Sequence, residues 1–396
     1  MAPLFCHPPT SKQEVFYMKI MISVGEASGD LHGASVANAL KLIQPDVQLV
    51  GMGGQAMRDA GVEIIYDIAD LGVIGIVEVI KNLRRLFRLR DFLSDYMERE
   101  RPDVLVVIDY PGFNVKLAKV AQQKGIPVVS YISPSAWAWG KGRAKEVAQL
   151  VERVAAIFPF EADVYRKAGA NVTFVGHPLL DIVKPSMERD EALQHFAALP
   201  DHYHVLLMPG SRTQEITSLL PDMLAAGERI VEQVPNCQFF LPVASTISRE
   251  MLQTIIDKYK VPVILTSGNN YDLMNICDLA IASSGTATLE TSLMKVPTVI
   301  VYRVVTLTYL LGKLLVKIPD IGLPNIIAGR RILPELLQSE VTPGNIASHA
   351  IALLTDQTVR EQALTDLAEV KEKLGETGAV NRVAQVIMEV AQNGHI

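Results

Sequence analysis

The sequence has too few cysteines, spaced too far apart, for a disulfide framework or a zinc site. It contains three, at Cys6, Cys237 and Cys277, without CxxC or Cys/His spacing. It also lacks any uninterrupted apolar run of the roughly 18 residues needed to span a bilayer. The nearest candidate, residues 304–318, is broken by Lys313 and Lys317. These absences fit a reducing cytoplasm and restrict any membrane contact to the bilayer surface.

Neither sign of charge is in large excess. The net charge of −6 argues against a broad nucleic-acid-binding surface, so we expect no nucleic-acid partner. The first 17 residues carry Pro8 and Pro9 and lack the apolar core and cleavage site of a signal peptide, which predicts a loose extension. Hydrophobic residues make up 49% of the 396 residues, enough for two folded domains.

Short β-branched runs alternate with turns and helix-period segments, which is typical of parallel βαβ units. The first half offers strands at 19–24, 48–51, 104–108, 128–132, 153–157 and 172–175, and the second at 205–208, 238–242, 263–266, 279–282 and 298–301. The sequence therefore predicts an α/β fold with two Rossmann-like doubly wound domains facing a cleft. The expected bounds are 1–17 for the extension, 18–184 and 185–358 for the domains, and 359–396 for C-terminal helices.

Ligands gather at the carboxyl ends of parallel strands, so the turns there are candidate sites. Loop 25–33 follows the first strand and combines glycines with Glu26, Ser28 and Asp30. Asp109 follows strand 104–108 and is the candidate general base. The alternatives are a polar loop that caps its helix and a turn or N-cap aspartate.

Both tryptophans, Trp137 and Trp139, follow the strand predicted at 128–132. Aromatic faces suit a sugar or an acyl chain, although two core tryptophans would explain the pair equally well. Three cations that suit a phosphate come next, at Lys141, Arg143 and Lys145.

Two turns of the second half can hold phosphate. In Gly210-Ser211-Arg212, backbone N–H groups, the positive end of a helix and a guanidinium predict a diphosphate cradle without a metal. The alternative is a capping box in which Glu215 pairs with Arg212. The second turn carries Ser284, Gly285 and Thr286, and Glu290 follows on the helix, where a carboxylate can clasp ribose hydroxyls.

Residues 71–90 combine an apolar lead-in with a helical stretch that carries five cations. Its apolar residues recur at helical spacing, so the pattern indicates a basic amphipathic helix that seeks anionic lipid. A core-packed helix with a solvated basic face is the alternative. A second apolar stretch, residues 307–318, suits an acyl groove or ordinary packing.

Taken together, these loops resemble the lipid-A-disaccharide synthases. The resemblance covers the chain from about residue 18 almost to its end. The motifs are GEASGD at 25–30, MGG at 52–54, GIVEV at 75–79, IDYPGFN at 108–114, SPSAWAW at 133–139, FPFE at 158–161, GHP at 176–178, PGSR at 209–212, SGTATLE at 284–290 and LPN at 323–325.

The resemblance implies a GT-B fold and an inverting, metal-independent glycosyltransferase. The expected reaction moves 2,3-diacylglucosamine from its UDP carrier to the 6-hydroxyl of 2,3-diacylglucosamine 1-phosphate, forming a β-1,6 tetraacyl disaccharide 1-phosphate and UDP in lipid A biosynthesis. No cofactor is expected beyond UDP as carrier and product. The resemblance matches Asp109 to the base, Arg212 and Glu290 to the nucleotide side, and Asn325 and the Glu26–Ser28 loop to positions near the reacting sugars.

The resemblance also bears on partners and location. Together with the basic stretch 71–90, it leads us to expect a cytoplasmic protein that is peripheral on the inner face of the inner membrane and bound through these residues. The tail from about Val359 either crosses back onto the first domain or exchanges with a partner chain in a homodimer. Two alternatives stay open: an enzyme like UDP-N-acetylglucosamine 2-epimerase, and a non-catalytic glycolipid carrier. The basic amphipathic stretch argues against the epimerase, because a soluble sugar nucleotide gives no reason for membrane affinity.

Overall fold

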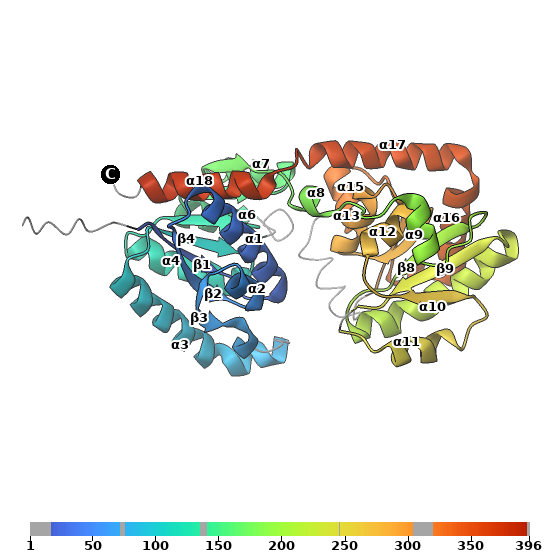
Figure 1. Cartoon of the computed structure of the whole chain (residues 1–396), viewed down its shortest axis with the longest axis horizontal. Helices are drawn as coiled ribbons and strands as arrows, with labels where there is room; N and C mark the ends of the chain where they lie inside the picture. Colours follow the sequence, from blue (N-terminus) through green and yellow to red (C-terminus); the bar gives the residue numbers. More distant parts are fainter. Residues whose placement is uncertain (1–16, 72–75, 135–140, 245, 304–319, 394–396) are drawn as a thin grey trace, which may run out of the picture. The chain divides into compact units, whose positions relative to one another are not determined.

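The computed structural model describes residues 17–71, 76–134, 141–244, 246–303 and 320–393 of the chain (Figure 1). These residues form two compact units. The first draws its residues from Met1–Pro134, Glu146–Ala155 and Val380–Ile396, and the second from Ser135–Lys145 and Ala156–Ala379.

The first sheet has seven strands in the order β3-β2-β1-β4-β5-β6-β7. Every pair whose register is described is parallel. The chain starts in the middle, moves to one side and then to the other, which is the Rossmann arrangement. The strands are β1 (Lys19–Ser23), β2 (Gln48–Gly53), β3 (Glu63–Asp67), β4 (Val104–Ile108), β5 (Val128–Tyr131), β6 (Arg153–Ala156) and β7 (Val172–Phe174).

The central strands of this sheet are apolar runs, and every residue of β4 is buried. Central strands of a parallel sheet read this way because helices cover both faces. On one face, α3 and α4 pack Leu93, Met97 and Leu117 against Met21 and Leu105 of the strands. The helices along this part of the chain are α1 (Ala27–Ile43), α2 (Gln55–Asp59), η1 (Ile68–Leu71), α3 (Ile76–Glu100), α4 (Pro111–Gln123), α6 (Lys141–Leu150) and α7 (Pro159–Lys167).

The second sheet has six strands in the order β10-β9-β8-β11-β12-β13 and is parallel throughout. It again begins in the middle, so the architecture of the first sheet recurs. The strands are β8 (Tyr203–Met208), β9 (Cys237–Pro242), β10 (Val263–Thr266), β11 (Leu279–Ser283), β12 (Thr298–Tyr302) and β13 (Glu335–Leu337).

Helices α10 and α16 supply much of the core of the second sheet, where Leu220 and Leu224 pack with Val205 and Leu207 of β8. The other face is covered partly by α9 and α12, which pack against each other and against Phe240. The helices of this part are α8 (Leu179–Ile182), α9 (Arg189–His195), α10 (Thr213–Gln233), α11 (Arg249–Ile256), α12 (Asn270–Ile276), α13 (Thr286–Leu293), α15 (Leu323–Ala328), η2 (Gln338–Glu340), α16 (Pro343–Thr355) and α17 (Gln357–Lys373).

The predicted α/β fold with two Rossmann-like sheets is confirmed. Each strand predicted from the sequence is present, with ends within two residues of those expected. Two edge strands, β3 and β13, were not predicted. The final helix, α18 (Ala379–Asn393), falls almost wholly within the first unit. The predicted domain boundaries stay predictions.

Among the helices that the structure describes, none combines the length and apolar character that a membrane span needs. The N-terminal extension predicted at 1–17 lies outside the described residues except for Tyr17.

Candidate active site

The carboxyl ends of β1, β4 and β5 meet along one side of the first sheet, because these strands are adjacent and parallel. We call the segments that follow β1 and β4, residues 24–33 and 109–114, the first edge; each includes the start of the next helix, α1 or α4. The structure therefore brings the predicted residues Glu26, Ser28 and Asp109 to the side of the sheet where open parallel sheets bind ligands.

Asp109 lies in a tight turn that Asn114 holds from within. Asp109 and Tyr110 both have a φ of 50°, in the left-handed region that few non-glycine residues adopt. The amide of buried Asn114 donates to the backbone oxygens of Ser23 and Ile108, each at 3.2 Å, and to that of Asp109 at 2.8 Å. Its oxygen accepts from the Ser23 hydroxyl at 2.7 Å. These bonds offset the strain of the turn and fix its direction.

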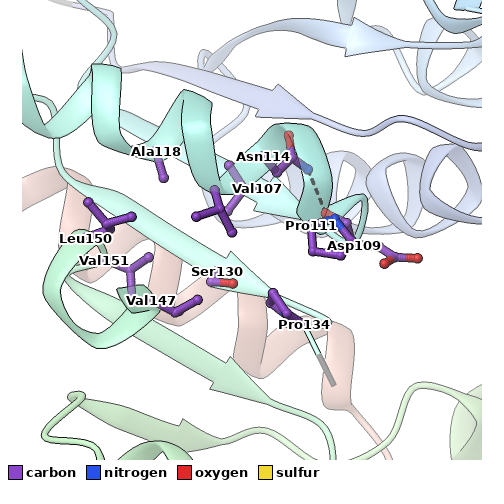
Figure 2. Close-up of a pocket in the computed structure, with 11 residues that line it drawn as sticks. Val107, Asp109, Pro111, Asn114, Ala118, Ser130, Pro134, Val147, Leu150 and Val151 are labelled. Carbon is purple, nitrogen blue, oxygen red and sulfur yellow. Dashed lines mark hydrogen bonds between the residues drawn. The ribbon is translucent and has the colours of Figure 1, made fainter. Parts of the chain in front are cut away.

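The carboxylate of Asp109 is free to accept a proton. Figure 2 shows it pointing away from the small cavity beside the turn, and within the described residues no donor is hydrogen-bonded to it. Burial lowers the pKa of His32, and the negative charge of Asp109 opposes this effect. A half-exposed, unpaired carboxylate at a strand end suits a general base.

The loop after β1 divides into an anchored part and an exposed part. Buried Asp30 accepts hydrogen bonds from the backbone N–H groups of Gly54, Ala56 and Met57 at 2.7, 2.9 and 3.2 Å, so it caps α2. Glu26 and Ser28 are exposed. Asp30 thus caps a neighbouring helix and not its own, α1, whose start has no side-chain cap. Glu26 and Ser28 stay available to a ligand.

Gly25 allows the two loops of the first edge to touch. A Cβ atom on Gly25 would lie 2.1 Å from the ring of Tyr110, so no larger residue fits there. Burial and the nearby Glu26 charge both raise the pKa of Tyr110. Glu26 and Asp109 thus approach the same tyrosine, one from each loop.

The cavity beside Asp109 is too small for a sugar. It has a volume of about 10 Å³ and is lined mainly by apolar side chains such as Val107, Ala118 and Leu150. In Figure 2 the side chains that line it come from β4, α4, β5 and the chain around Val147 to Val151, beside the turn that carries Asp109. It belongs to the packing that supports the turn.

The turn after β8 and the helix start after β11 lie next to each other in the second sheet, because β8 and β11 are paired in parallel. We call residues 209–215 and 284–290 the second edge. The carboxylate of Glu215 accepts from the N–H groups of Ser211 and Arg212 at 3.1 and 3.3 Å, and pairs with the Arg212 guanidinium at 3.2 Å. The capping-box alternative is therefore realised, although the Arg212 side chain remains 82% exposed. Gly210, at a φ of 120°, leaves no room for a Cβ beside Glu215.

The start of α13 presents groups of different availability. Gly285 and Thr286 are exposed, and the Ser284 hydroxyl donates to the Ile321 carbonyl at 3.1 Å. Glu290 is half-buried and accepts a hydrogen bond from the Tyr271 hydroxyl at 3.1 Å. Burial raises the pKa of Glu290, and the bond from Tyr271 lowers it.

Glu290 lines a pocket that the sequence did not reveal. The pocket has a volume of about 360 Å³. Its signal in the sequence is weak, since Asn269 and Asn270 follow a strand but Lys184 lies far away along the chain. The other residues that line it are Lys184, Ser186, Asn269, Asn270, Tyr271 and Asp272.

The structure places Asn325 in the interior of the second unit. It is fully buried, and its amide donates to the Leu333 carbonyl at 2.9 Å and to Glu335 at 2.7 Å. Its oxygen accepts from the N–H groups of Ile332 and Leu333. With every polar group bonded internally, Asn325 holds the loop between α15 and β13, and its placement gives no support to the prediction that it lies near the reacting sugars.

Other predictions fall outside the described residues. These are the tryptophan pair Trp137 and Trp139 and the apolar stretch 307–318. The predicted membrane stretch 71–90 is described in part, with side chains from Arg84 onward.

Comparison with known proteins now decides the family. A family model for lipid-A-disaccharide synthetase matches residues 20–390. A lipid-A-disaccharide synthase of Geobacter sulfurreducens is 44% identical over 94% of this chain and 97% of its own. Those of Syntrophus aciditrophicus and Coxiella burnetii are 43% and 40% identical over 92% and 93% of this chain, and over 96% and 97% of their own. The chain belongs to the lipid-A-disaccharide synthetase family.

Membership of the lipid-A-disaccharide synthetase family makes the chain a glycosyltransferase of lipid A biosynthesis, as the sequence predicted. Solved structures support the fold. The glycotransferase of kitacinnamycin has a TM-score of 0.64 at 16% identity, covering 94% of this chain and 99% of its own. A UDP-GlcNAc 2-epimerase from Neisseria meningitidis has the same TM-score at 13% identity, covering 94% and 100%. At such low identity the likeness extends to the GT-B fold alone.

Proposed function

We propose that the chain transfers 2,3-diacylglucosamine from UDP to the 6-hydroxyl of 2,3-diacylglucosamine 1-phosphate, with inversion at the sugar, and releases UDP. The observation that carries this proposal is the shared name of relatives 39–44% identical over more than nine-tenths of the chain. The two edges supply the groups that such a transfer needs, a free carboxylate on one and cationic and N–H donors on the other.

On the acceptor side, we assign the base to Asp109. As its carboxylate accepts the proton of the acceptor hydroxyl, the oxygen attacks the anomeric carbon and the bond from that carbon to the diphosphate breaks. The turn held by Asn114 supports this role, because a fixed carboxylate need not reorganise during the reaction. Glu26 and Ser28 are exposed on the same edge and suit hydrogen bonds to sugar hydroxyls.

On the donor side, we assign the diphosphate to Gly210, Ser211 and Arg212 together with Ser284, Gly285 and Thr286 at the start of α13. Backbone N–H groups and a guanidinium stabilise the negative charge of the departing UDP, so this step needs no metal ion or other cofactor. Glu215 already binds two of these N–H groups, which indicates that they are directed at an anion. Glu290 is assigned to the ribose hydroxyls.

The membrane surface is proposed as the site of action, on the inner face of the inner membrane. The described part of α3 exposes Phe87 and Phe92, and Lys116 of α4 lies 5.8 Å from the Phe87 ring. Aromatic side chains among cations suit the interface of an anionic bilayer. The exposed cations nearby on α3 are Arg84, Arg85 and Arg88.

Vesicle sedimentation tests this surface. Replacing both Arg85 and Arg88 by alanine is expected to weaken binding to vesicles containing phosphatidylglycerol about tenfold or more. Replacing both Arg166 and Lys167, two exposed cations on α7, by alanine is the matched control, and this variant should bind as the unmodified protein does. Equal binding to purely zwitterionic vesicles would count against the electrostatic part of the proposal.

A homodimer formed by exchange of the tail is a further proposal. Helix α18 buries Val383, Ile387 and Val390, and residues 374–378 join it to α17. The same contacts would form if two chains exchanged this helix. Sedimentation equilibrium should then give twice the mass of one 43.4 kDa chain, and a single-chain mass at every concentration would reject the dimer.

The reaction itself is tested by incubating the purified protein with UDP-diacylglucosamine and diacylglucosamine 1-phosphate and analysing the products by mass spectrometry. We expect the tetraacyl disaccharide 1-phosphate and one UDP for each disaccharide. A carrier would bind the glycolipid without releasing UDP, and an epimerase would convert UDP-N-acetylglucosamine to its manno epimer. Either result without the disaccharide would reject the proposal.

A further inference from the structure

Tyr271 and Glu290 form one hydrogen-bonded pair from two different helices. Tyr271 lies at the start of α12 and Glu290 on α13, and the tyrosine hydroxyl donates to Glu290 Oε1 at 3.1 Å. In the part of the chain that the structure describes, no other hydrogen bond to the Glu290 carboxylate is found. The second oxygen, Oε2, is therefore uncommitted, and both residues line the pocket of about 360 Å³.

The protonation states of the pair suit a tyrosine donor and a carboxylate acceptor. Burial, the Glu290 charge and the hydrogen bond all raise the pKa of Tyr271, so its hydroxyl keeps its proton at neutral pH. Burial raises the pKa of Glu290, and the bond from Tyr271, which favours the charged form, limits that rise. A charged acceptor makes this bond stronger than one between neutral groups.

An unrestrained glutamate loses side-chain freedom whenever it binds a ligand. A partner that holds one carboxylate oxygen reduces that cost and directs the other oxygen toward the ligand. The pocket around the pair is polar, with the amides of Asn269 and Asn270 and the ammonium of Lys184 on its walls. These groups suit a hydroxyl-rich ligand next to an anionic group.

We propose that Tyr271 is a positioning residue that holds Glu290 in the orientation needed to bind the ribose hydroxyls of the uridine nucleotide. The inference rests on the proposed function, which assigns those hydroxyls to Glu290. Tyr271 touches the carboxylate, and its effect on the nucleotide passes through Glu290.

Nucleotide analogues isolate this effect. Dissociation constants for UDP, 2′-deoxy-UDP and 3′-deoxy-UDP are measured by calorimetry on the full-length protein and on Tyr271→Phe, which keeps the ring and removes the hydroxyl. The unmodified protein is expected to prefer UDP over the weaker-binding deoxy analogue about tenfold. In Tyr271→Phe this preference should fall to about threefold or less, while the affinity for that deoxy analogue stays unchanged.

Two further variants complete the comparison. Glu290→Ala should abolish the preference for UDP. Tyr259→Phe, a partly buried tyrosine packed against the opposite face of the same sheet, should keep it in full. With UDP-diacylglucosamine as substrate, Tyr271→Phe should raise KM several-fold and leave kcat within about twofold of the unmodified value, since the contact is made equally in the bound and transition states.

The outcomes separate the inference from the proposed function. If Glu290→Ala loses the preference and Tyr271→Phe retains it, the positioning role is wrong and the nucleotide assignment stands. A tyrosine variant with lowered kcat and unchanged KM would also overturn the positioning role. If the unmodified protein does not bind UDP, or binds it without any preference over either deoxy analogue, the proposed nucleotide site and the inference both fail.

Discussion

The two edges bear similar loops on similar sheets but hold their polar groups differently. On the first edge, the anchoring residues Asp30 and Asn114 are buried, and the reactive candidate Asp109 is left unpaired among the described residues. On the second edge, Arg212 and Glu290 are candidate ligands that already pair with protein groups. The first edge therefore has its base ready, whereas Arg212 must exchange or share its internal partner when a nucleotide binds.

Burial decides which internal pair can exchange. Glu161 after β6 and Glu215 after β8 make the same contact, each accepting from two backbone N–H groups at the start of a helix. Glu161 is 2% exposed, while the Glu215 side chain is 27% exposed and pairs with an arginine that is largely in solvent. The Glu161 contact is a fixed part of the fold, whereas a phosphate can displace the Glu215 carboxylate.

The largest expected effect comes from removing the carboxylate of Asp109 on the first edge. Asp109→Asn keeps a residue that tolerates a left-handed φ but removes the proton acceptor. We expect kcat to fall about a thousandfold, measured by release of UDP. Asn38→Ala, an exposed change on α1 outside the proposed site, is the control for local disturbance. A kcat within tenfold of the unmodified enzyme would exclude Asp109 as the base.

Removing a buried anchor should affect stability strongly. Asp30→Ala leaves three backbone N–H groups without their acceptor and is expected to lower the free energy of unfolding by about 3 kcal/mol. Urea denaturation measures the loss. Asp59→Ala, at the exposed end of the same short helix, should change stability by less than about 0.5 kcal/mol. Equal effects of the two changes would show that Asp30 does not anchor this edge.

The burial of Glu161 predicts that stability depends on pH. Burial raises the pKa of Glu161 to about 7, above the value of 4.5 for an unperturbed glutamate. Between these values the folded state binds more protons than the unfolded state, so this group makes stability fall as pH rises from 4.5 to 7. The loss is roughly 3 kcal/mol, since one pKa unit corresponds to about 1.4 kcal/mol.

Glu161→Gln removes this titration while keeping an oxygen that can accept from the same N–H groups. Its unfolding free energy, followed by urea denaturation at several pH values, should lose this downward slope across the interval. If the slope of Glu161→Gln equals that of the unmodified protein, folding does not raise the pKa of Glu161.

The smallest expected effect tests whether Glu215 on the second edge competes with the diphosphate. Glu215→Gln keeps an acceptor at the start of α10 but removes a negative charge next to the proposed diphosphate. UDP is expected to bind about threefold more tightly, as a like-charge contact is relieved at a largely solvated site. Calorimetry measures the change. Weaker binding would indicate that Glu215 holds Arg212 in its binding position and does not compete with the ligand.

Local pattern predicted every central strand but missed two of the four edge strands, β3 and β13. β4 is buried on both faces, so its sequence is one apolar run. β13 has only three residues and begins at Glu335, whose buried carboxylate bonds to the N–H groups of Ile321 and Gly322. No apolar periodicity marks such a strand, because its first residue is a glutamate. The N–H groups of a distant loop bind the carboxylate, and only these bonds make it compatible with the interior.

The site residues were predictable where reactive or charged side chains directly follow a strand. Asp109, Arg212 and Glu290 all lie in or just after such turns. The hydrogen-bond partners that hold these residues could not be predicted from the sequence. Tyr271 reaches Glu290 from another helix, and Asn325 looked like a ligand residue because its motif resembles the family, while its bonds are all internal. Only the folded structure shows which polar groups are already bonded.

The most direct test of this division of labour measures UDP affinity and turnover on the same preparations of Asp109→Asn and Arg212→Ala. The account predicts that Asp109→Asn binds UDP as tightly as the unmodified protein and loses turnover, whereas Arg212→Ala loses UDP affinity by at least about tenfold. If Asp109→Asn weakens UDP binding as much as Arg212→Ala does, or if Arg212→Ala binds UDP normally, the two edges do not share the work in this way.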